Sequence, residues 1–182
     1  MSTMEERSLR ERLMAAAVAA LEAGASDLSL RALAREVGVS AMAPYRHFAD
    51  KAALLGAVAV DGFERLREAL LAADGQAEGS DALVAQGLAY LRFASDHPAL
   101  FRLMFSGACA PPTPSGDNAY GVLARRVATL TSDPAAMLAC WALVHGLATL
   151  ALDGPAPPEG QPSAAADPAA ALRLLADGLA KR

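Results

Sequence analysis

The chain has 182 residues, which is enough for one sizeable hydrophobic core or for a small head joined to a larger body. Hydrophobic residues make up 54% of the sequence and aromatic residues only 5%, so alanine and leucine, both strong helix formers, supply most of the apolar content. The net charge is −4, with seven Lys or Arg against seven Asp or Glu in residues 1–51, so overall charge neither supports nor excludes a nucleic-acid partner.

The pattern of the sequence predicts an all-α fold, because no segment alternates apolar and polar residues with β-branched enrichment. The two cysteines, Cys109 and Cys140, match no metal or redox spacing and are expected to be reduced thiols. The charged N-terminal sequence MSTMEERSLRERL lacks an apolar signal core. We therefore expect a cytoplasmic protein.

The first predicted helix begins at two overlapping capping boxes, in which Ser2 and Thr3 precede Glu5 and Glu6. Leucine and alanine then recur at helical spacing, and Gly24 ends the helix.

Two further helices are predicted before residue 51. Ser29 is expected to cap the first of them, which ends at Gly38. A short segment from about residue 39 to residue 48 follows, with Ser40 as its cap, and Asp50 caps a longer helix over 51–73.

The rest of the chain reads as helices joined by two irregular segments. Helices are predicted over 81–96, 98–105, 119–130, 134–152 and 168–180. The irregular segments, 106–118 and 154–168, are rich in proline.

Residues 134–152 are nineteen residues without Asp, Glu, Lys or Arg, the length of a membrane-spanning helix. Acids lie directly outside both ends, at Asp133 and Asp153, and basic interfacial anchors are missing there. A buried or subunit-facing helix is the preferred interpretation, with no membrane partner.

The segment LRALAREVGVSAMAPYRHF has the layout of a helix-turn-helix, whose second helix enters the major groove. Residues 40–43 would lie nearest the base edges, Tyr45 and His47 at phosphates, and Arg46 at a phosphate or a guanine. Lys51, at the start of the next helix, would bind a phosphate. The predicted DNA-binding residues are Ser29, Arg31, Ser40, Ala41, Met42, Ala43, Tyr45, Arg46, His47 and Lys51.

Two residues in this segment have other expected roles. Phe48 is expected to turn inward as a core anchor. Pro44 removes the first intrahelical N–H donor, so the second helix must begin irregularly or be very short. On topology alone, such a helix pair could equally belong to a bundle that does not bind DNA.

These residues resemble the TetR (tetracycline-repressor-like) family of bacterial regulators. The head likeness lies in LRALAREVGVSAMAPYRHFADKAALL, where Val37 and Pro44 depart from the usual residues. CWALVHGLATLALDG is similar to the Trp-x-x-x-His-Gly segment of one C-terminal domain type in that family. The resemblance implies a three-helix DNA-binding domain over 1–50, followed by a helical effector-binding and dimerisation domain over 51–182.

The resemblance also implies that the body binds a small molecule and pairs with a second copy. The sizeable apolar groups expected to line the ligand site are Tyr90, Phe93, Phe101, Met104, Phe105, Tyr120, Trp141 and His145. His145 alone would more often bond a neighbouring carbonyl or hydroxyl group, and no metal-ligand spacing surrounds it. The predicted dimer residues are Leu143, Leu147, Leu150, Leu172, Leu175 and Leu179.

The predicted function is a homodimeric repressor that a small-molecule effector releases from a pseudo-palindromic DNA operator. No catalytic motif is found, and no enzyme activity, cofactor or metal is expected. The alternative is a small helical enzyme or ligand carrier with a purely structural head.

Overall fold

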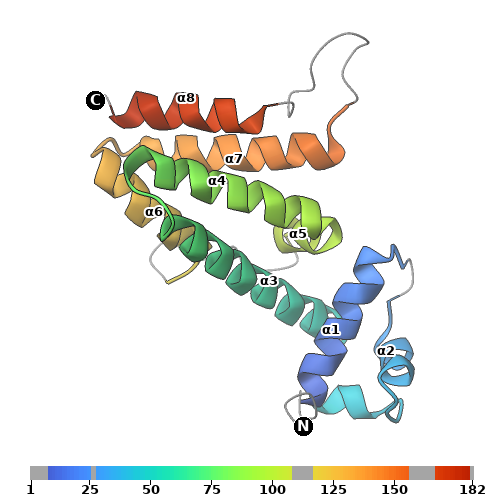
Figure 1. The fold of residues 1–182 in the computed structure, drawn as a ribbon. Coiled ribbons are helices and arrows are strands. Elements are labelled where there is room, and N and C mark those ends of the chain that lie inside the picture. Colours follow the sequence, from blue (N-terminus) through green and yellow to red (C-terminus); the bar gives the residue numbers. More distant parts are fainter. Residues whose placement is uncertain (1–7, 26–27, 108–116, 156–166, 181–182) are drawn as a thin grey trace. The chain divides into compact units, whose positions relative to one another are not determined.

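The computed structural model describes residues 8–25, 28–107, 117–155 and 167–180. Over these residues the chain forms eight α-helices and one short 3-10 helix, with no β-strand (Figure 1). The prediction of an all-α fold is therefore confirmed.

Contacts divide the chain into two compact units. The first comprises Met1–Gly62 and His97–Pro111, and the second Phe63–Asp96 and Pro112–Arg182. The long helix α3 (Lys51–Asp74) contributes residues to both units. The domain bounds 1–50 and 51–182, which the family resemblance implies, stay predictions.

The first unit contains α1 (Leu9–Glu22), α2 (Leu30–Glu36), the 3-10 helix η1 (Ala43–Arg46) and α5 (Pro98–Phe105). Helix α1 packs against α2 and α5, and α2 packs against η1. Leu13, Ala17 and Leu33 are buried in this unit.

Helix α1 begins later than the sequence predicted. Ser2 and Thr3 lie outside the described residues, whereas Ser8 is the observed N-cap, in a capping box with Glu11. Glu11 N donates to Ser8 Oγ at 3.3 Å, and Ser8 N donates to Glu11 Oε2 at 2.9 Å. The helix ends as predicted at Gly24, whose φ of 73° suits a residue without Cβ.

Helix α2 follows its prediction. Ala32 N donates to Ser29 Oγ at 3.2 Å, so Ser29 is the N-cap. Gly38, with a φ of 75°, ends this segment.

The third element is a four-residue 3-10 helix, as expected of a helix that begins irregularly or is very short, but the prediction that Ser40 caps it was wrong. Its N-cap residue is Met42, and no side chain caps it. Pro44 explains the difference, because it has no N–H to give to an α-helical bond near the start of the segment. Pro44 is itself buried, as is Phe48, which confirms the inward orientation predicted for Phe48.

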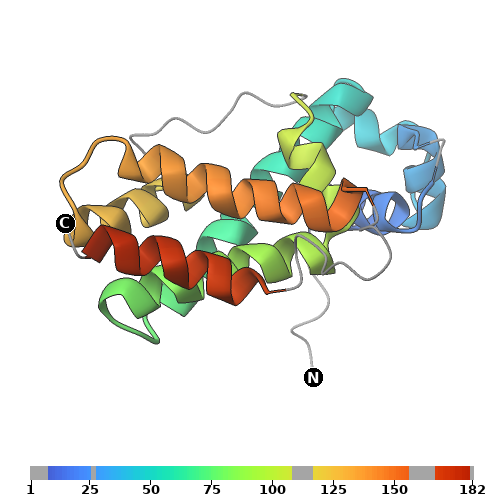
Figure 2. The same ribbon diagram turned by 90° about the horizontal axis from the view of Figure 1, so that it is seen from above.

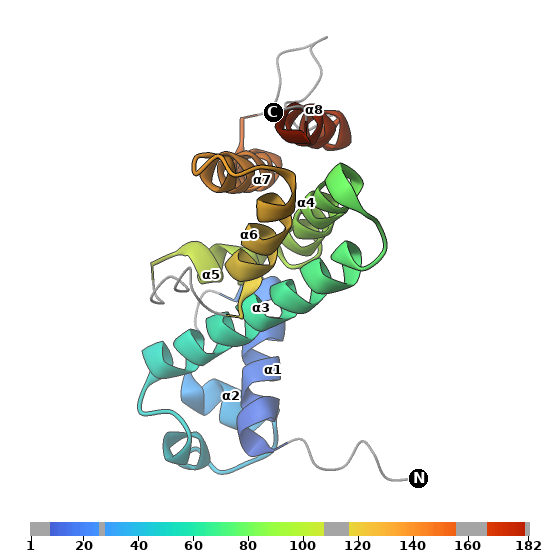
Figure 3. The same ribbon diagram turned by 90° about the vertical axis from the view of Figure 1, so that its left-hand side faces the viewer.

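The second unit is built around α4 (Gly79–Asp96), which packs against α6 (Ala119–Leu130), α7 (Ala136–Asp153) and α8 (Pro168–Ala180). Helices α7 and α8 run side by side over this group (Figures 1 and 2). Figure 3 shows the two helices nearly end-on. Helices α6 and α8 have the predicted bounds, and α7 begins two residues after the predicted start at Pro134. Most of the two proline-rich segments lies outside the described residues.

Helix α7 is the one helix, within the described residues, whose length and composition would allow it to cross a membrane. One of its faces packs inside the second unit, where Cys140, Val144 and Ala148 are buried. The opposite face exposes Leu138 and Leu150. A face that packs inside the protein and a face left exposed agree with the interpretation of a buried or subunit-facing helix.

Candidate DNA-binding head and effector cavity

The predicted DNA-binding residues lie around η1 and at the starts of α2 and α3. Met42 and Tyr45 are 65% and 41% exposed, which is unusual for side chains of their size. The cations Arg46 and Lys51 are also exposed. The remaining exposed members are Arg31, Ser40, Ala41 and His47, whereas Ser29 and Ala43 are half-buried.

Two arginines on α1 contact the segment that carries this surface. The Arg12 guanidinium donates to the carbonyl oxygen of Val37, which precedes the turn. The Arg10 guanidinium carbon lies 5.4 Å from the centre of the Phe48 ring, in cation–π geometry. Sequence reasoning missed both roles, because each contact joins residues far apart in the chain.

Helix α5 is tied to α1 through Glu22. The Glu22 carboxylate accepts hydrogen bonds from Ala99 N and Leu100 N, both at 3.0 Å. These are N–H groups of the first turn of α5, where the N-cap residue His97 gives no side-chain cap. A carboxylate suits this position because it meets free donors and the positive end of the helix dipole.

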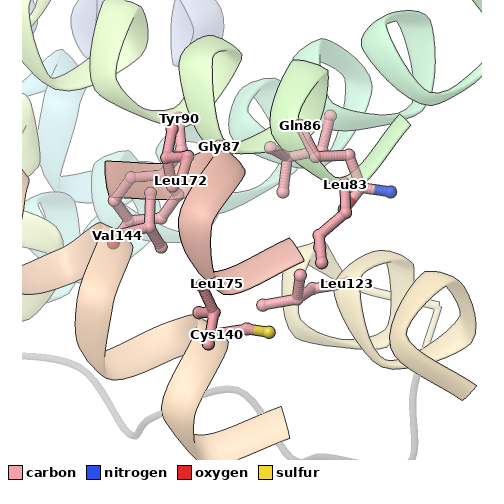
Figure 4. Close-up of a pocket in the computed structure, with 10 residues that line it drawn as sticks. Leu83, Gln86, Gly87, Tyr90, Leu123, Cys140, Val144, Leu172 and Leu175 are labelled. Carbon is pink, nitrogen blue, oxygen red and sulfur yellow. The ribbon is translucent and has the colours of Figure 1, made fainter. Parts of the chain in front are cut away.

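The second unit contains a cavity of about 30 Å³ (Figure 4). Residues from α3, α4, α6, α7 and α8 surround it: Leu70, Leu83, Gln86, Gly87, Tyr90, Leu123, Cys140, Val144, Leu172 and Leu175. Of the eight residues predicted to contact a ligand, Tyr90 lines this cavity. Most of the other residues that line the cavity were not predicted, because the prediction favoured aromatic groups, whereas aliphatic side chains make most of the wall.

Polar groups at the Gln86 side of the cavity form a connected set. Gln86 Nε2 donates to Asp74 Oδ1 at 2.6 Å. Arg126 donates from Nε and Nη2 to the two Asp74 carboxylate oxygens, at 2.7 and 2.9 Å. The hydrogen bonds from Arg126 and from Gln86 lower the pKa of Asp74 below its usual 3.8, against an opposing effect of burial.

Four ring side chains meet beside the cavity. Tyr90 Oη lies 2.9 Å from His145 Nδ1, so His145 has the hydroxyl partner expected of a lone histidine on an apolar helix. His145 stacks on Trp141 with 5.7 Å between ring centres, and Trp141 meets Tyr120 edge-on at 6.4 Å. Burial raises the pKa of Tyr90 and lowers that of His145, so both rings stay neutral near pH 7.

The structure divides the predicted ligand residues between the two units. Tyr90, Phe93, Tyr120, Trp141 and His145 lie in the second unit. Phe101, Met104 and Phe105 lie on α5 in the first.

The α5 group has a packing role in its own unit. Phe101 and Phe105 pack with ring centres 4.9 Å apart. A Cβ at Gly62 would lie 2.7 Å from Met104 Sδ, so α3 and α5 approach closely there.

The predicted dimer residues are also divided. Leu147, Leu172 and Leu179 are buried within their own chain, and Leu143 and Leu175 are half-buried. Leu150 is 47% exposed.

Sequence reasoning missed the most exposed leucines of α7 and α8. Leu138 is 62% exposed and Leu174 79% exposed. An open groove of about 530 Å³ runs along the two helices and is lined in part by Leu143, Leu174 and Leu179.

No group of three or more His, Cys, Asp or Glu within the described ranges could hold a metal ion. The expectation of a chain without metal or cofactor stays a prediction.

Two family models match the sequence. Residues 13–58 match the model of bacterial regulatory proteins of the tetR family, and residues 83–179 match the tetracyclin repressor-like C-terminal domain. No curated protein matches. The narrower likeness in the Trp-x-x-x-His-Gly segment stays a prediction.

Solved structures with the same fold were also found. A protein with unknown function from Rhodococcus sp. RHA1 is 32% identical, with a TM-score of 0.70, and the match covers 99% of this chain and 100% of that one. A bacterial regulatory protein in the tetR family from Rhodococcus RHA1 is 22% identical, with a TM-score of 0.67 and coverage of 96% and 98%. A TetR family transcription regulator from Marinobacter aquaeolei VT8 is 20% identical, with a TM-score of 0.65 and coverage of 91% and 94%.

Proposed function

Because the chain belongs to the tetR family of bacterial regulatory proteins and is a DNA-binding transcriptional regulator, we propose that it is a homodimeric repressor controlled by a small molecule. Regulators of this family bind DNA, act in general as dimers with small-molecule ligands, and are in general not enzymes. The observation that carries the proposal is the exposed surface around η1, where Tyr45, Arg46 and Lys51 face solvent.

In this proposal the surface around η1 reads one half of the operator. Residues 40–43 approach the base edges, and the exposure of Met42 leaves its thioether free to contact a thymine methyl group. Tyr45, Arg46 and His47 bind the flanking phosphates. Lys51 binds a further phosphate at the start of α3.

Two copies pair through the outward faces of α7 and α8. Leu138, Leu150 and Leu174 would then be covered, together with the open groove between the two helices. A two-fold dimer reads two inverted half-sites, with centres about 34–36 Å apart in the simplest spacing.

The effector enters the second unit at the cavity beside Tyr90. For the operator to be released, the effector must bind the DNA-free conformation more tightly, typically by about 1–3 kcal/mol. Helix α3 is the element through which this preference reaches the head, because it runs without interruption from Lys51 to Asp74. A repressor of this kind acts in the cytoplasm.

The experiment is a gel shift with DNA from upstream of the protein's own gene. A specific shift that is lost when candidate small molecules are added supports the proposal. The alternative, a helical enzyme or carrier with a structural head, predicts no sequence-specific shift.

A further inference from the structure

Gln86, one of the residues that line the cavity, has an oxygen atom without a hydrogen-bond donor among the described residues. This atom is Oε1, on a residue that is only 1% exposed. Native proteins seldom leave a buried carbonyl oxygen without a donor, because water is lost from it and nothing replaces the bond. Such an atom beside a cavity indicates a partner that enters from outside the chain.

The orientation of the Gln86 amide is fixed by its other bond. Nε2 donates to Asp74 Oδ1, and Asp74 is held as a carboxylate by Arg126. A turned amide would place Oε1 against a carboxylate oxygen, two acceptors with no proton between them. Oε1 is therefore the atom of Gln86 that remains to meet a ligand.

The remainder of the wall defines the ligand that fits. Seven of the ten lining residues are leucine, valine or glycine, and none of the ten carries a formal charge at neutral pH. Arg126 does not line the cavity, and its charge is paired with the Asp74 carboxylate through two nitrogens. An anion would therefore lose its hydration without gaining a cation.

We propose that Gln86 Oε1 is the hydrogen-bond acceptor of the effector site, and that the effector is a neutral, mainly apolar molecule with one O–H or N–H donor. This inference rests on the proposed function and deepens it by naming the chemistry of the ligand. The cavity, about 30 Å³, has room for a group the size of a water molecule, so a larger ligand must move a side chain.

We expect Leu172 of α8 to be the side chain that such a ligand displaces. It fills the space above Gly87 of α4, where a Cβ would lie only 2.8 Å from Leu172 Cδ1 and Cδ2. Figure 4 shows Leu172 beside Gly87 and Tyr90, with Gln86 and Leu83 at another part of the wall. Leu172 belongs to α8, one of the two proposed dimer helices, so its displacement would alter the packing of that helix.

The test uses matched probes that differ in one group. Phenol and toluene have similar size, but only phenol has a donor; benzoate supplies an anion on the same ring. Binding to the full chain without DNA is measured by calorimetry. We expect the unaltered chain to prefer phenol to toluene by roughly tenfold or more and not to bind benzoate, and we expect Gln86→Met to abolish the preference.

Two variants serve as controls. Leu123→Met changes the wall but keeps the acceptor, so the preference for phenol should persist. Leu172→Ala shortens one side chain of the wall and enlarges the cavity, so phenol and toluene should both bind more tightly and by similar factors.

The proposal is overturned by equal binding of phenol and toluene, by a preference that survives in Gln86→Met, by tighter binding of benzoate, or by no binding of any probe at millimolar concentration. If Gln86→Met does not fold, a crystal structure of the unaltered chain with phenol decides. The hydroxyl within hydrogen-bond distance of Oε1 supports the site, and any other position contradicts it.

These outcomes are separable from those of the operator experiment. If the chain binds phenol through Gln86 but no donor-bearing ligand releases it from DNA, the result supports the proposed ligand site and contradicts effector control. A chain released by some other molecule, without the Gln86-dependent preference, contradicts this site alone.

Discussion

Pro44 decides the form of the surface proposed to meet DNA. A proline at this position prevents an ordinary first α-turn, and the chain responds with a 3-10 helix whose start buries the ring. The sequence predicted an irregular or short helix here, together with an inward Phe48. It did not predict the contacts of Arg10 and Arg12, because residues that meet across a fold leave no local pattern.

At this scale the proposed phosphate contacts can be tested one charge at a time. We expect Arg46→Ala and Lys51→Ala each to weaken operator binding and to lower the slope of log affinity against log salt by about one. Fluorescence anisotropy across a salt series gives both quantities.

The matched control for these substitutions is Arg173→Ala, which removes an exposed cation of α8 that pairs with Asp81 at 3.3 Å. It should leave the salt slope unchanged. Unchanged slopes in both head variants would remove Arg46 and Lys51 from the DNA surface.

Elements with local signals were predicted well. Helices α6 and α8 have their predicted bounds, and Ser29 and Asp50 cap as expected, because a cap and an apolar stripe are both written within a few residues. The cap of α5 was not predicted, because its carboxylate comes from Glu22 in a distant part of the chain. The cavity wall was predicted poorly for the same reason, since five helices contribute to it.

The cap of α5 makes a stability prediction. We expect Glu22→Ala to lower the free energy of unfolding by about 1 kcal/mol, because two first-turn N–H groups lose a charged acceptor. Urea unfolding monitored by circular dichroism measures the change. Glu36→Ala, an exposed carboxylate at the end of α2, is the control and should change stability by less than about 0.5 kcal/mol.

The ion pair between Asp74 of α3 and Arg126 of α6 predicts that the free energy of unfolding depends on pH. The pKa of Asp74 is lowered from 3.8 in the folded chain, so its ionised form adds stability above that value, and this stability is lost as pH falls through the lower folded-state pKa. We expect Asp74→Asn to cost about 1–2 kcal/mol at pH 7 and progressively less below about pH 4.

Unfolding of both chains in urea between about pH 7 and pH 2 tests this sign. Asp81→Asn is the control, since its exposed ion pair should give a small difference at every pH. A difference for Asp74→Asn that grows in acid would contradict the role of the Arg126 pair.

At the scale of the whole molecule, the proposed dimer interface is the feature that local sequence signals specify least. The leucine stripe of residues 168–180 predicted an apolar helix correctly, but it could not say which leucines face inward. Leu172 and Leu179 are turned into the second unit, whereas Leu174 is 79% exposed. Apolar spacing identifies a helix face, and only the surrounding helices determine what that face contacts.

This difference gives a test of the proposed dimer. We expect Leu174→Glu to convert the protein to monomers at micromolar concentration, because the substitution places a charge in an apolar contact, and to weaken binding to a two-half-site operator. Analytical ultracentrifugation and gel shifts measure the two effects. The control is Leu71→Glu, at a 39% exposed leucine of α3, which should leave the protein dimeric. A Leu174→Glu variant that is still dimeric would show that the interface does not include Leu174.

The shortness of η1 has a consequence for how such a regulator finds its targets in a chromosome. A four-residue 3-10 helix extends only about 8 Å, close to two base-pair steps, and only its first residue, Ala43, belongs to the segment 40–43 that is proposed to approach the base edges. So short a recognised sequence occurs often by chance in a chromosome. Specificity would then depend on two half-sites together and on the spacing between them. The number of regulator molecules in the cell would then determine how many mismatched sites are occupied.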